Sequence, residues 1–499
     1  MNYTAILRNH ARNRPTHLAV ADPTSGIAYA QFDALVDAAA VRLAGEGVRQ
    51  GDVVAVAIGD RVEYLLALFA VLRVGAVFFG VTQAATAEAL RGELEQFEAR
   101  WLLTDAERDV PSAVRTIGVD AAWRNAGPLS SLPFDMPHDP ALPAYIVQTS
   151  GTVSGKPRGV ALTHGDLAQR LRSSQTSMGY GPWDRFASLV PLSFNVGRIH
   201  MMQTLQTGGT VLILPPSAPT SSVPELVSKN AVTWMFLTPF HLRRLMQRFA
   251  QAERPVLGGL HQLVVASSAL SAQERAAARR LLSPNLIEQY GTAQCGLHSI
   301  STPADQARAP DAVGRIIVGS EAQIVDADDR PLAPGAIGEI RLRGPGFATG
   351  YWKDPEASAR NFRDGWFYPG DLAAIDADGY LHLKGRVDDM FVHDGINVYP
   401  EEIEAVLALH PQVADVAVVG QRTDAGQEIP VAVLVVRSPL TQEELHGFCA
   451  PRLSDVKRPR AFYFIPELPK NDLGKTIRRQ LRAALPVLVS ANAKPLPRA

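Results

Sequence analysis

The chain has 499 residues, which is too long for one ordinary hydrophobic core and suggests about three domain-sized units. Apolar residues make up 46% and charged residues 20%, as in soluble globular proteins. The 49 basic and 50 acidic side chains cancel, which argues against general attraction to nucleic acid or an anionic membrane, so any phosphate group must be bound by a local site.

The sequence carries no sign of secretion or of a membrane span. Residues 1–5 lack a basic region followed by an apolar core, so they do not form a secretory signal. An arginine and a glycine interrupt the longest apolar stretch, residues 64–81, which predicts a buried helix followed by a buried strand. Cys295 and Cys449 are too few and too far apart for a metal site or a disulfide framework. We therefore expect a cytoplasmic protein.

Helical and strand patterns alternate in the first part of the chain. They predict helices at residues 31–43 and 62–72 and strands at residues 53–58 and 76–81. Such alternation predicts layered α/β structure with crossover helices. Further strands are expected at residues 145–147, 210–214, 232–237 and 263–266.

The pattern changes after residue 312. Short strands separated by turns, at residues 313–383, predict a β-rich subdomain. A further unit begins near Asp388, where Pro400 opens a helix whose acidic first turn complements the helix dipole. Strands at residues 413–419 and 431–436 follow it.

This last unit continues with a capping-box pattern, Thr441 and Glu444, at the start of another helix. The residues after Pro486 are rich in Ala, Pro and Ser and predict a loose tail. Together the patterns predict an α/β fold with a large multi-sheet N-terminal domain, residues 1–386, that holds layered α/β subdomains and the β-rich subdomain. A small α+β C-terminal domain, residues 387–499, completes it.

The strongest local signal follows the strand at residue 145. Glycines there would let backbone N–H groups converge on an anion, hydroxyls would donate further hydrogen bonds, and two basic side chains would supply charge. The segment is not a Walker A loop, because its glycines are one residue too close and Pro157 stands where Ser or Thr should follow. A flexible surface loop is the alternative to a phosphate loop. The segment reads Thr149-Ser150-Gly151-Thr152-Val153-Ser154-Gly155-Lys156-Pro157-Arg158-Gly159-Val160.

At this segment the sequence resembles the adenylate-forming superfamily, which comprises acyl-CoA synthetases, adenylation domains of peptide synthetases and luciferases. The phosphate loop of that superfamily reads roughly Thr-Ser-Gly-Thr-Thr-Gly-x-Pro-Lys-Gly. This chain has one extra residue, taken as Val153, and Arg158 replaces the usual lysine. Since arginine keeps the charge but changes its geometry, phosphate binding should survive with altered detail.

Further blocks follow in the family's order and extend the resemblance over residues 10–482. Taken singly, each block could be core packing, a turn or a solvated charge, but the ordered series favours the family. The blocks are Ala266-Ser267-Ser268-Ala269, Tyr290-Gly291-Thr292-Ala293-Gln294, Gly338-Glu339-Ile340 with Gly350-Tyr351, Phe367-Tyr368-Pro369-Gly370-Asp371, Gly385-Arg386-Val387-Asp388-Asp389 and Pro469-Lys470-Asn471-Asp472-Leu473-Gly474-Lys475.

The resemblance implies a nucleotide site and a role for each matching residue. Tyr290 packs on adenine, Asp371 accepts both ribose hydroxyls, which a carboxylate can do, and Arg386 lies beside ribose and phosphate as a catalytic group. Asp388 is the hinge and Lys475 the catalytic lysine. The ATP- and AMP-binding residues are Thr149, Ser150, Gly151, Thr152, Ser154, Gly155, Lys156, Arg158, Ser268, Ala269, Tyr290, Gly291, Thr292, Asp371 and Arg386.

The implied reaction converts a carboxylate into an acyl-adenylate at the expense of ATP and then passes the acyl group to the thiol of coenzyme A. Two anions must approach each other, so positioning and cationic stabilisation matter more than acid–base chemistry. Lys475 bridges the carboxylate and the α-phosphate, after which the small domain rotates about Asp388 and brings Gly395 toward the thiol channel. ATP, Mg²⁺ and coenzyme A, or the phosphopantetheine of a carrier protein, are the expected cofactors.

Three departures from the family pattern bear on metal and substrate. Gln294 replaces a glutamate associated with magnesium, which predicts weaker dependence on Mg²⁺ rather than loss of activity. Asn195 is neutral where amino acid-activating members place an aspartate, which predicts a substrate without an α-amino group. Ser267 and Ser268 replace glycines and should narrow the pocket, which favours a short, aromatic or functionalised acid over a long fatty chain.

The acid pocket is expected to include Phe194, Asn195, Phe236, Ser267 and His298, with ordinary core or rim packing as the alternative for each. Two other functions stay open. A stand-alone adenylating enzyme could load a carrier protein in trans, and a pseudoenzyme could bind nucleotide without turnover. The expected partners are a small carboxylic acid, ATP and coenzyme A, and the chain is expected to be a monomer or a homodimer.

Overall fold

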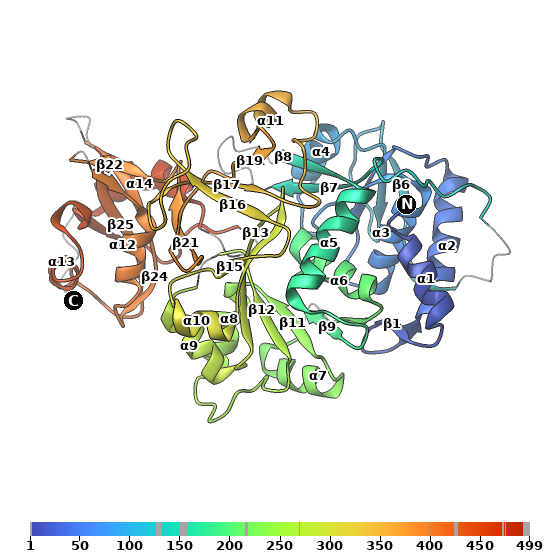
Figure 1. Cartoon of the computed structure of the whole chain (residues 1–499), viewed down its shortest axis with the longest axis horizontal. Coiled ribbons are helices and arrows are strands. Elements are labelled where there is room, and N and C mark those ends of the chain that lie inside the picture. The colour runs from blue at the N-terminus through green and yellow to red at the C-terminus, as the bar shows by residue number, and fades with distance from the viewer. Residues whose placement is uncertain are drawn as a thin grey trace.

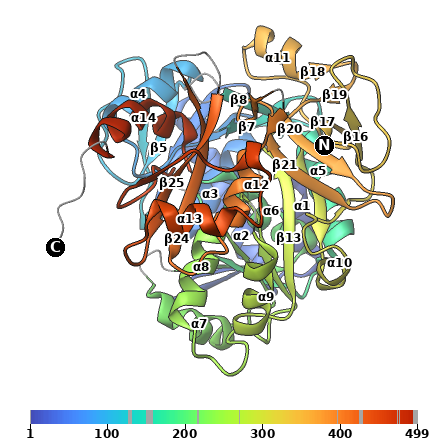
Figure 2. The same ribbon diagram turned by 90° about the vertical axis from the view of Figure 1, so that its left-hand side faces the viewer.

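The computed structural model describes residues 2–125, 132–149, 158–214, 218–268, 270–394, 396–423, 428–471, 474 and 476–492. The N-terminal elements lie at one end of the molecule and the C-terminal elements at the other, with the β-rich sheet between them (Figure 1). Figure 2, viewed from the C-terminal end, shows α12, α13, β24 and β25 in front of the rest of the chain. The predicted α/β fold with several sheets is confirmed.

The larger sheet of the N-terminal part has the order β15-β14-β13-β12-β11-β9-β10-β1-β2. In this spatial order the six strands from β13 to β1 pair in parallel. Strands β2, β14 and β15, at the two edges, are antiparallel to their neighbours. Central strands such as β11 are buried apolar runs, as expected for parallel strands covered on both faces. The bounds are β1 (Leu18–Ala21), β2 (Gly26–Ala28), β9 (Arg185–Ser188), β10 (Thr210–Ile213), β11 (Trp234–Leu237), β12 (Gln262–Val265), β13 (Leu286–Thr292), β14 (Gly296–Ser301) and β15 (Arg315–Ile316).

The second N-terminal sheet has the order β6-β5-β3-β4-β7-β8. Its last pair, β7 and β8, is antiparallel and places Thr149 opposite Arg158. The two ends of the expected phosphate loop are therefore held by a strand pair. The bounds are β3 (Val53–Ala57), β4 (Val77–Gly80), β5 (Trp101–Thr104), β6 (Arg115–Gly118), β7 (Pro143–Thr149) and β8 (Arg158–Thr163).

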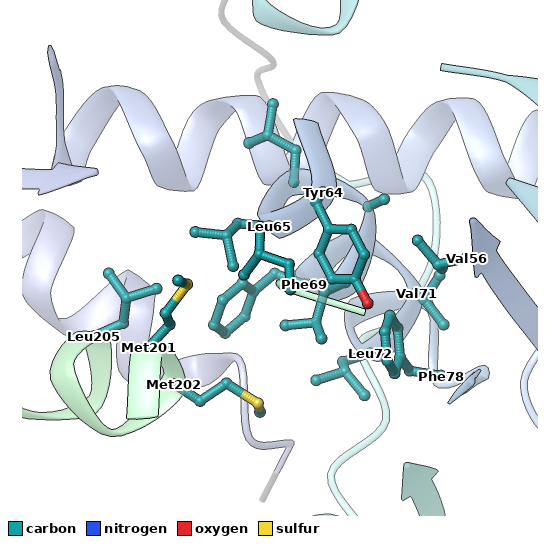
Figure 3. Packing of buried hydrophobic residues seen from close by; sticks show 14 of the residues in the cluster. Val56, Tyr64, Leu65, Phe69, Val71, Leu72, Phe78, Met201, Met202 and Leu205 are labelled. Atoms are coloured by element: carbon teal, nitrogen blue, oxygen red, sulfur yellow. The ribbon is translucent and has the colours of Figure 1, made fainter. Parts of the chain in front are cut away.

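The main core lies between these two sheets, and α3 runs through it with every residue buried. Side chains of α3 lie between Phe78 of β4 and Met202 of α6 (Figure 3). The arginine inside this apolar helix, Arg73, is neutralised by ion pairs with Asp33 (2.6 Å) and Asp37 (2.7 Å). The prediction of a buried helix followed by a buried strand is confirmed. In the described ranges no helix is both long and apolar enough to cross a membrane.

The helices of this part begin at recognisable caps. In α5, for example, Thr163 Oγ1 accepts a hydrogen bond from the Asp166 N–H (3.0 Å), and the Asp166 carboxylate accepts one from the Thr163 N–H (2.9 Å). The bounds are α1 (Ala5–Asn13), α2 (Tyr29–Glu46), α3 (Val62–Val74), α4 (Ala87–Gln96), η1 (Ala121–Arg124), α5 (His164–Met178), α6 (Asn195–Thr207), η2 (Thr220–Ser222), α7 (Val223–Lys229), α8 (Pro239–Arg248), α9 (Ala272–Leu281), α10 (Pro303–Arg308) and α11 (Pro355–Asn361).

A third sheet confirms the β-rich region. Its order is β18-β19-β17-β20-β21, and β16 pairs with β17. The bounds are β16 (Glu321–Val325), β17 (Gly338–Arg343), β18 (Phe362–Arg363), β19 (Trp366–Phe367), β20 (Asp371–Ile375) and β21 (Leu381–Arg386).

The C-terminal elements have cores of their own around the sheet β24-β25-β26. The expected capping box at Thr441 and the proline start of the helix at Pro400 are confirmed. The loose tail after Pro486 is wrong in part, because α14 continues through this proline, with Leu481 and Leu485 buried against the sheet. The bounds are β22 (Phe391–His393), β23 (Ile396–Val398), α12 (Pro400–Leu407), β24 (Val413–Arg422), β25 (Glu428–Val436), α13 (Gln442–Cys449), η3 (Asp455–Lys457), β26 (Ala461–Phe464) and α14 (Arg478–Asn492).

Candidate functional site

Three of the expected site residues meet around one carboxylate. Tyr290 lies in β13, Asp371 begins β20 and Arg386 ends β21, directly opposite Asp371 in the ladder. The Tyr290 hydroxyl donates to Asp371 Oδ2 (2.6 Å), and Arg386 Nη1 donates to Asp371 Oδ1 (2.8 Å) and to the Pro369 carbonyl (2.8 Å). The larger sheet and the β-rich sheet are thus joined at this carboxylate.

The protonation states of this group follow from its surroundings. Burial, reinforced by the Asp371 carboxylate, raises the pKa of Tyr290 well above its ordinary value, so the phenol stays protonated and donates. Burial alone would lower the pKa of Arg386, but the carboxylates of Asp371 and Asp388 outweigh it and raise the pKa. The site therefore combines a fixed carboxylate with a permanent positive charge.

A second cluster lies where the expected phosphate loop joins β8. Arg158 Nε donates to Asp354 Oδ2 (3.2 Å), and its guanidinium lies 5.5 Å from the centre of the Tyr351 ring. The Gln294 side chain donates from Nε2 to the Tyr351 hydroxyl (3.1 Å). Gln294 and Arg158, which the sequence placed near metal and phosphate, thus meet through Tyr351.

Several predicted site residues lie outside the described residues. They are Ser150, Gly151, Thr152, Ser154, Gly155 and Lys156 of the phosphate loop, with Ala269, Gly395 and Lys475.

Other predicted nucleotide residues flank the described clusters. Thr149 ends β7, and Gly291 and Thr292 end β13, where Thr292 Oγ1 accepts a hydrogen bond from the Cys295 N–H (3.2 Å). Ser268 lies half-buried after β12. The hinge residue Asp388 follows β21, and its carboxylate lies 3.7 Å from Arg386 Nη2. These roles stay predictions.

The residues expected in the acid pocket come from several elements. Phe194 precedes α6, and Asn195 begins it and accepts a hydrogen bond from the Tyr145 hydroxyl (3.2 Å). Phe236 of β11 is buried and its ring centre lies 4.6 Å from that of His200, further along α6. Helix α6 therefore connects the surroundings of Asn195 with those of Phe236.

Ser267 and His298 occupy unusual environments. Ser267 is exposed and adopts a left-handed backbone conformation, φ +93°, at a position where the family resemblance has glycine. His298 is completely buried between Tyr290 and Phe347, at ring-centre distances of 6.0 and 5.0 Å. Burial, assisted by the charge of Arg170, lowers the pKa of His298 to about 3, so its ring is neutral.

Sequence reasoning missed part of the polar framework around Asn195. Arg198, one turn into α6, is buried and donates to the hydroxyls of Tyr145 (2.6 Å) and Tyr64 (3.2 Å). Tyr145 in turn donates to Asn195, which fixes the start of α6. A charged residue among apolar neighbours could have signalled this role, but its partners are distant in sequence.

Gln294 is the described residue that the sequence associates with a metal ion. Among the described residues no group of three or more His, Cys, Asp or Glu side chains could form a metal cage. The amide nitrogen of Gln294 donates to the Tyr351 hydroxyl, so only its neutral amide oxygen is available to a metal ion. Mg²⁺ bound to nucleotide phosphates needs few protein ligands, because phosphate oxygens and water complete its octahedron.

Comparison with known proteins covers nearly the whole chain. A family model described as AMP-binding enzyme matches residues 7–352, and one described as AMP-binding enzyme C-terminal domain matches residues 402–475. The chain is 31% identical to the indoleacetate–CoA ligase of Aromatoleum aromaticum, over 97% of this chain and 98% of that protein. It is 30% identical to the 2-succinylbenzoate–CoA ligase of Geobacillus kaustophilus, over 96% and 97%.

The fold of the chain is also similar to that of a solved structure. The O-succinylbenzoate–CoA synthetase MenE of Bacillus subtilis, in complex with ATP and magnesium ion, matches with a TM-score of 0.87 at 25% sequence identity. The match covers 96% of this chain and 99% of that one.

Proposed function

Because the chain belongs to the AMP-binding enzyme family, within the adenylate-forming superfamily, we propose that it is an acid–thiol ligase of the AMP-forming acyl-CoA synthetase type. It activates a carboxylic acid without an α-amino group to acyl-AMP and transfers the acyl group to coenzyme A. The observation that carries the proposal is the group of Tyr290, Asp371 and Arg386, which joins segments far apart in sequence around one carboxylate.

Nucleotide binding follows from this group. Tyr290 offers a ring face to adenine, and Asp371 accepts hydrogen bonds from the ribose hydroxyls, since a carboxylate oxygen can accept more than one hydrogen bond. Arg386 holds the carboxylate in place and adds positive charge toward the α-phosphate. The loop of residues 149–158 receives the β- and γ-phosphates, and Ser268 and Ala269 border the adenine.

In the first half-reaction a carboxylate oxygen of the substrate attacks the α-phosphorus of ATP. The bond from that phosphorus to the bridging oxygen breaks, and pyrophosphate leaves. Lys475 neutralises the two approaching anions, while Lys156 and Arg158 stabilise the departing phosphates. When bound, Mg²⁺ neutralises charge on the phosphate oxygens, and Gln294 is the residue that would face it.

In the second half-reaction the C-terminal domain, residues 387–499, rotates about Asp388 and withdraws Lys475. The segment at Gly395 then lines the path of the thiol. The sulfur attacks the acyl carbon, the bond from that carbon to the phosphate oxygen breaks, AMP leaves, and the thiol proton passes to solvent. A short connection between β21 and β22 supports such a rotation.

The substrate proposed is an aromatic or otherwise functionalised acid. Asn195 is neutral and already accepts a hydrogen bond from Tyr145, so it gives an α-ammonium group no ionic partner. Ser267 and Ser268 narrow the pocket that Phe194, Phe236 and His298 help to form. Two relatives carry the names of arylalkanoic or aromatic acids, indoleacetate and 2-succinylbenzoate, which supports the same class.

A panel of acids tests the proposal. Pyrophosphate release is measured with ATP, Mg²⁺ and short, aromatic, dicarboxylic, long-chain and α-amino acids. We expect release with aromatic or functionalised acids and little with α-amino acids or long fatty acids. If no acid gives pyrophosphate although ATP binds, the chain is a nucleotide-binding pseudoenzyme. If ordinary α-amino acids react fastest, the interpretation of Asn195 is wrong.

The thiol acceptor is tested separately. With the best acid, thioester formation is compared on free coenzyme A and on a carrier protein bearing phosphopantetheine. We expect the thioester on free coenzyme A. A thioester formed on the carrier protein alone would instead identify a stand-alone enzyme that loads a carrier in trans.

A further inference from the structure

Helix α5 carries a buried arginine without an acidic partner. Arg170 is 3% exposed, and among the described residues no carboxylate lies within salt-bridge distance of its guanidinium. Burial lowers the pKa of Arg170 to about 10, which still leaves it charged near neutral pH. A buried charge without a counter-ion is costly unless its hydrogen bonds are fully used.

Backbone carbonyls take the place of the counter-ion. Arg170 Nη1 donates to the Ala293 carbonyl (3.0 Å), and Nη2 donates to the carbonyls of Gln294 (2.7 Å) and Gly346 (3.0 Å). Nε donates to the same Gly346 carbonyl (3.2 Å). All three nitrogens therefore bind backbone oxygens of two loops, the turn between β13 and β14 and the loop between β17 and α11.

Each loop packs against Arg170 through a glycine, Gly296 against the side chain and Gly346 against the helix backbone. A Cβ on Gly296 would lie 2.8 Å from Arg170 Cδ, and a Cβ on Gly346 would lie 2.7 Å from the backbone nitrogen of Arg170. The two glycines also have positive φ, +78° and +69°. A side chain at position 296 would therefore clash with the Arg170 side chain, and one at position 346 would clash with the backbone of α5.

The cradle of backbone carbonyls around Arg170 is linked to the phosphate side of the candidate site. The Gln294 carbonyl that Arg170 binds also accepts a hydrogen bond from the Ala348 N–H (2.9 Å). The Gln294 side chain donates to the Tyr351 hydroxyl, and the Tyr351 ring faces Arg158. Arg170 thus joins two loops, and one residue of each, Gln294 and Tyr351, are in contact next to the expected phosphate loop.

The residues expected to bind the nucleoside are held in place by hydrogen bonds that do not involve Arg170. Tyr290, Asp371 and Arg386 hold one another through their own hydrogen bonds, and Arg170 takes no part in them. Arg275, an arginine with a purely structural role, differs from Arg170 in its hydrogen-bond partners. Arg275 is similarly buried but pairs with the Glu288 carboxylate (2.5 Å) and so ties α9 to β13.

We propose that Arg170 is a positioning residue for the triphosphate: by binding the carbonyls of Ala293, Gln294 and Gly346, it holds the Gln294 turn and the Tyr351 loop in place beside Arg158. This inference rests on the proposed function, since it assumes that ATP phosphates lie beside Gln294. The arginine does not touch the substrate, and it acts through Gln294 and Tyr351.

The test compares ATP with AMP. Dissociation constants of both nucleotides are measured by calorimetry, with Mg²⁺ and without acid, for the wild type and for Arg170→Met. We expect the dissociation constant of ATP to rise about tenfold and that of AMP by less than about threefold, because mutation of a supporting hydrogen-bond partner typically has this size of effect. Arg172→Met, two residues along α5 on its exposed side, is the matched control and should change neither.

A double-mutant cycle with Gln294→Ala separates positioning from loss of stability. If Arg170 acts through the Gln294 turn, adding Arg170→Met to Gln294→Ala should weaken ATP binding by less than about twofold more. Full additivity, or equal weakening of ATP and AMP, would overturn the proposal. Should Arg170→Met not fold, Arg170→Lys, which can reach fewer carbonyls, must show the same preferential loss of ATP.

Failure of the proposed function gives a different result. If the wild-type protein binds no ATP, the ligase proposal fails before Arg170 is tested. If the wild type binds ATP and Arg170→Met binds it equally well, the ligase proposal stands and the positioning role fails.

Discussion

At the scale of single residues, Asp371 accepts hydrogen bonds from two neighbours of different charge. Tyr290 brings a neutral donor and Arg386 a charged one, one on each carboxylate oxygen. The carboxylate is therefore oriented before a nucleotide binds, so that little rotamer entropy remains to be lost on binding. The same arrangement leaves further lone pairs of the Asp371 carboxylate able to accept hydrogen bonds from a sugar.

Asp371→Asn should weaken ATP binding by about 10- to 100-fold, because hydrogen bonds to a charged acceptor contribute about 1.5–3 kcal/mol. Titration calorimetry measures the change. Asp376→Asn is the matched control, since Asp376 lies at the far end of the same strand region and contacts His382 (2.9 Å). An unchanged dissociation constant for Asp371→Asn would remove this carboxylate from the nucleotide site.

At the scale of elements, the junction of α12, α14 and the turn after β21 concentrates acids. Arg478 of α14 contacts Glu404 (2.8 Å), Glu401 (3.0 Å) and Asp389 (3.4 Å), and the Glu401 carboxyl lies against Gly385 of β21. Burial raises the pKa of Glu401 from 4.5 to about 7, since Arg478 only partly offsets burial and the nearby Glu404 and Asp389 raise the pKa further. Arg482 shares Asp389 (3.1 Å).

This junction predicts a pH effect on stability. Glu401 binds its proton more tightly in the folded protein, so its favourable contribution is complete below pH 4.5 and is lost as pH rises through about 7. As pH rises from 5 to 8 the wild type loses this contribution and Glu401→Gln does not. The Tm of the variant minus the Tm of the wild type should therefore become more positive, by on the order of a few degrees. Glu402→Gln, which removes a surface pair with Lys457, should give a difference that does not grow with pH. A pH-independent difference for Glu401→Gln would contradict the assignment.

Local patterns predicted the elements well and their assembly poorly. The capping box at Thr441 and the proline start at Pro400 depend only on neighbours in sequence, so the patterns were sufficient. The helix through Pro486 was missed because packing of α14 on the C-terminal sheet overrides a local breaker. The carbonyl cradle of Arg170 joins residues more than 100 positions apart, a contact that no local pattern reports. Family order, in contrast, predicted a shared site for Tyr290 and Asp371, which are in contact in the structure.

At the scale of the whole molecule, the segment beside Lys475 contacts the N-terminal part. Gly474 lies against Phe240, since a Cβ on the glycine would be 3.0 Å from the Phe240 Cβ. Phe240 lies in the first turn of α8, which follows β11 and its Phe236. Gly474 of the C-terminal domain therefore lies beside the helix that follows β11.

Lys475→Ala should affect the two half-reactions unequally. We expect pyrophosphate release to fall at least about 10³-fold, because a positive charge is lost where two anions react, while thioester formation from supplied acyl-adenylate changes far less. Single-turnover assays of each half-reaction measure the two effects. Lys470→Ala, which removes a pair with Asp415 (2.5 Å) in the same segment, is the control. Equal losses in both half-reactions would contradict the domain rotation.

The complete burial of α3 determines how the N-terminal half can fold. Residues of both N-terminal sheets contribute to the core that surrounds this helix, so neither sheet alone can shield it from water. A fragment truncated between the sheets would expose an apolar helix and should aggregate rather than form a smaller stable unit. Although it is long and contains two sheets, this half of the chain should unfold in a single cooperative transition.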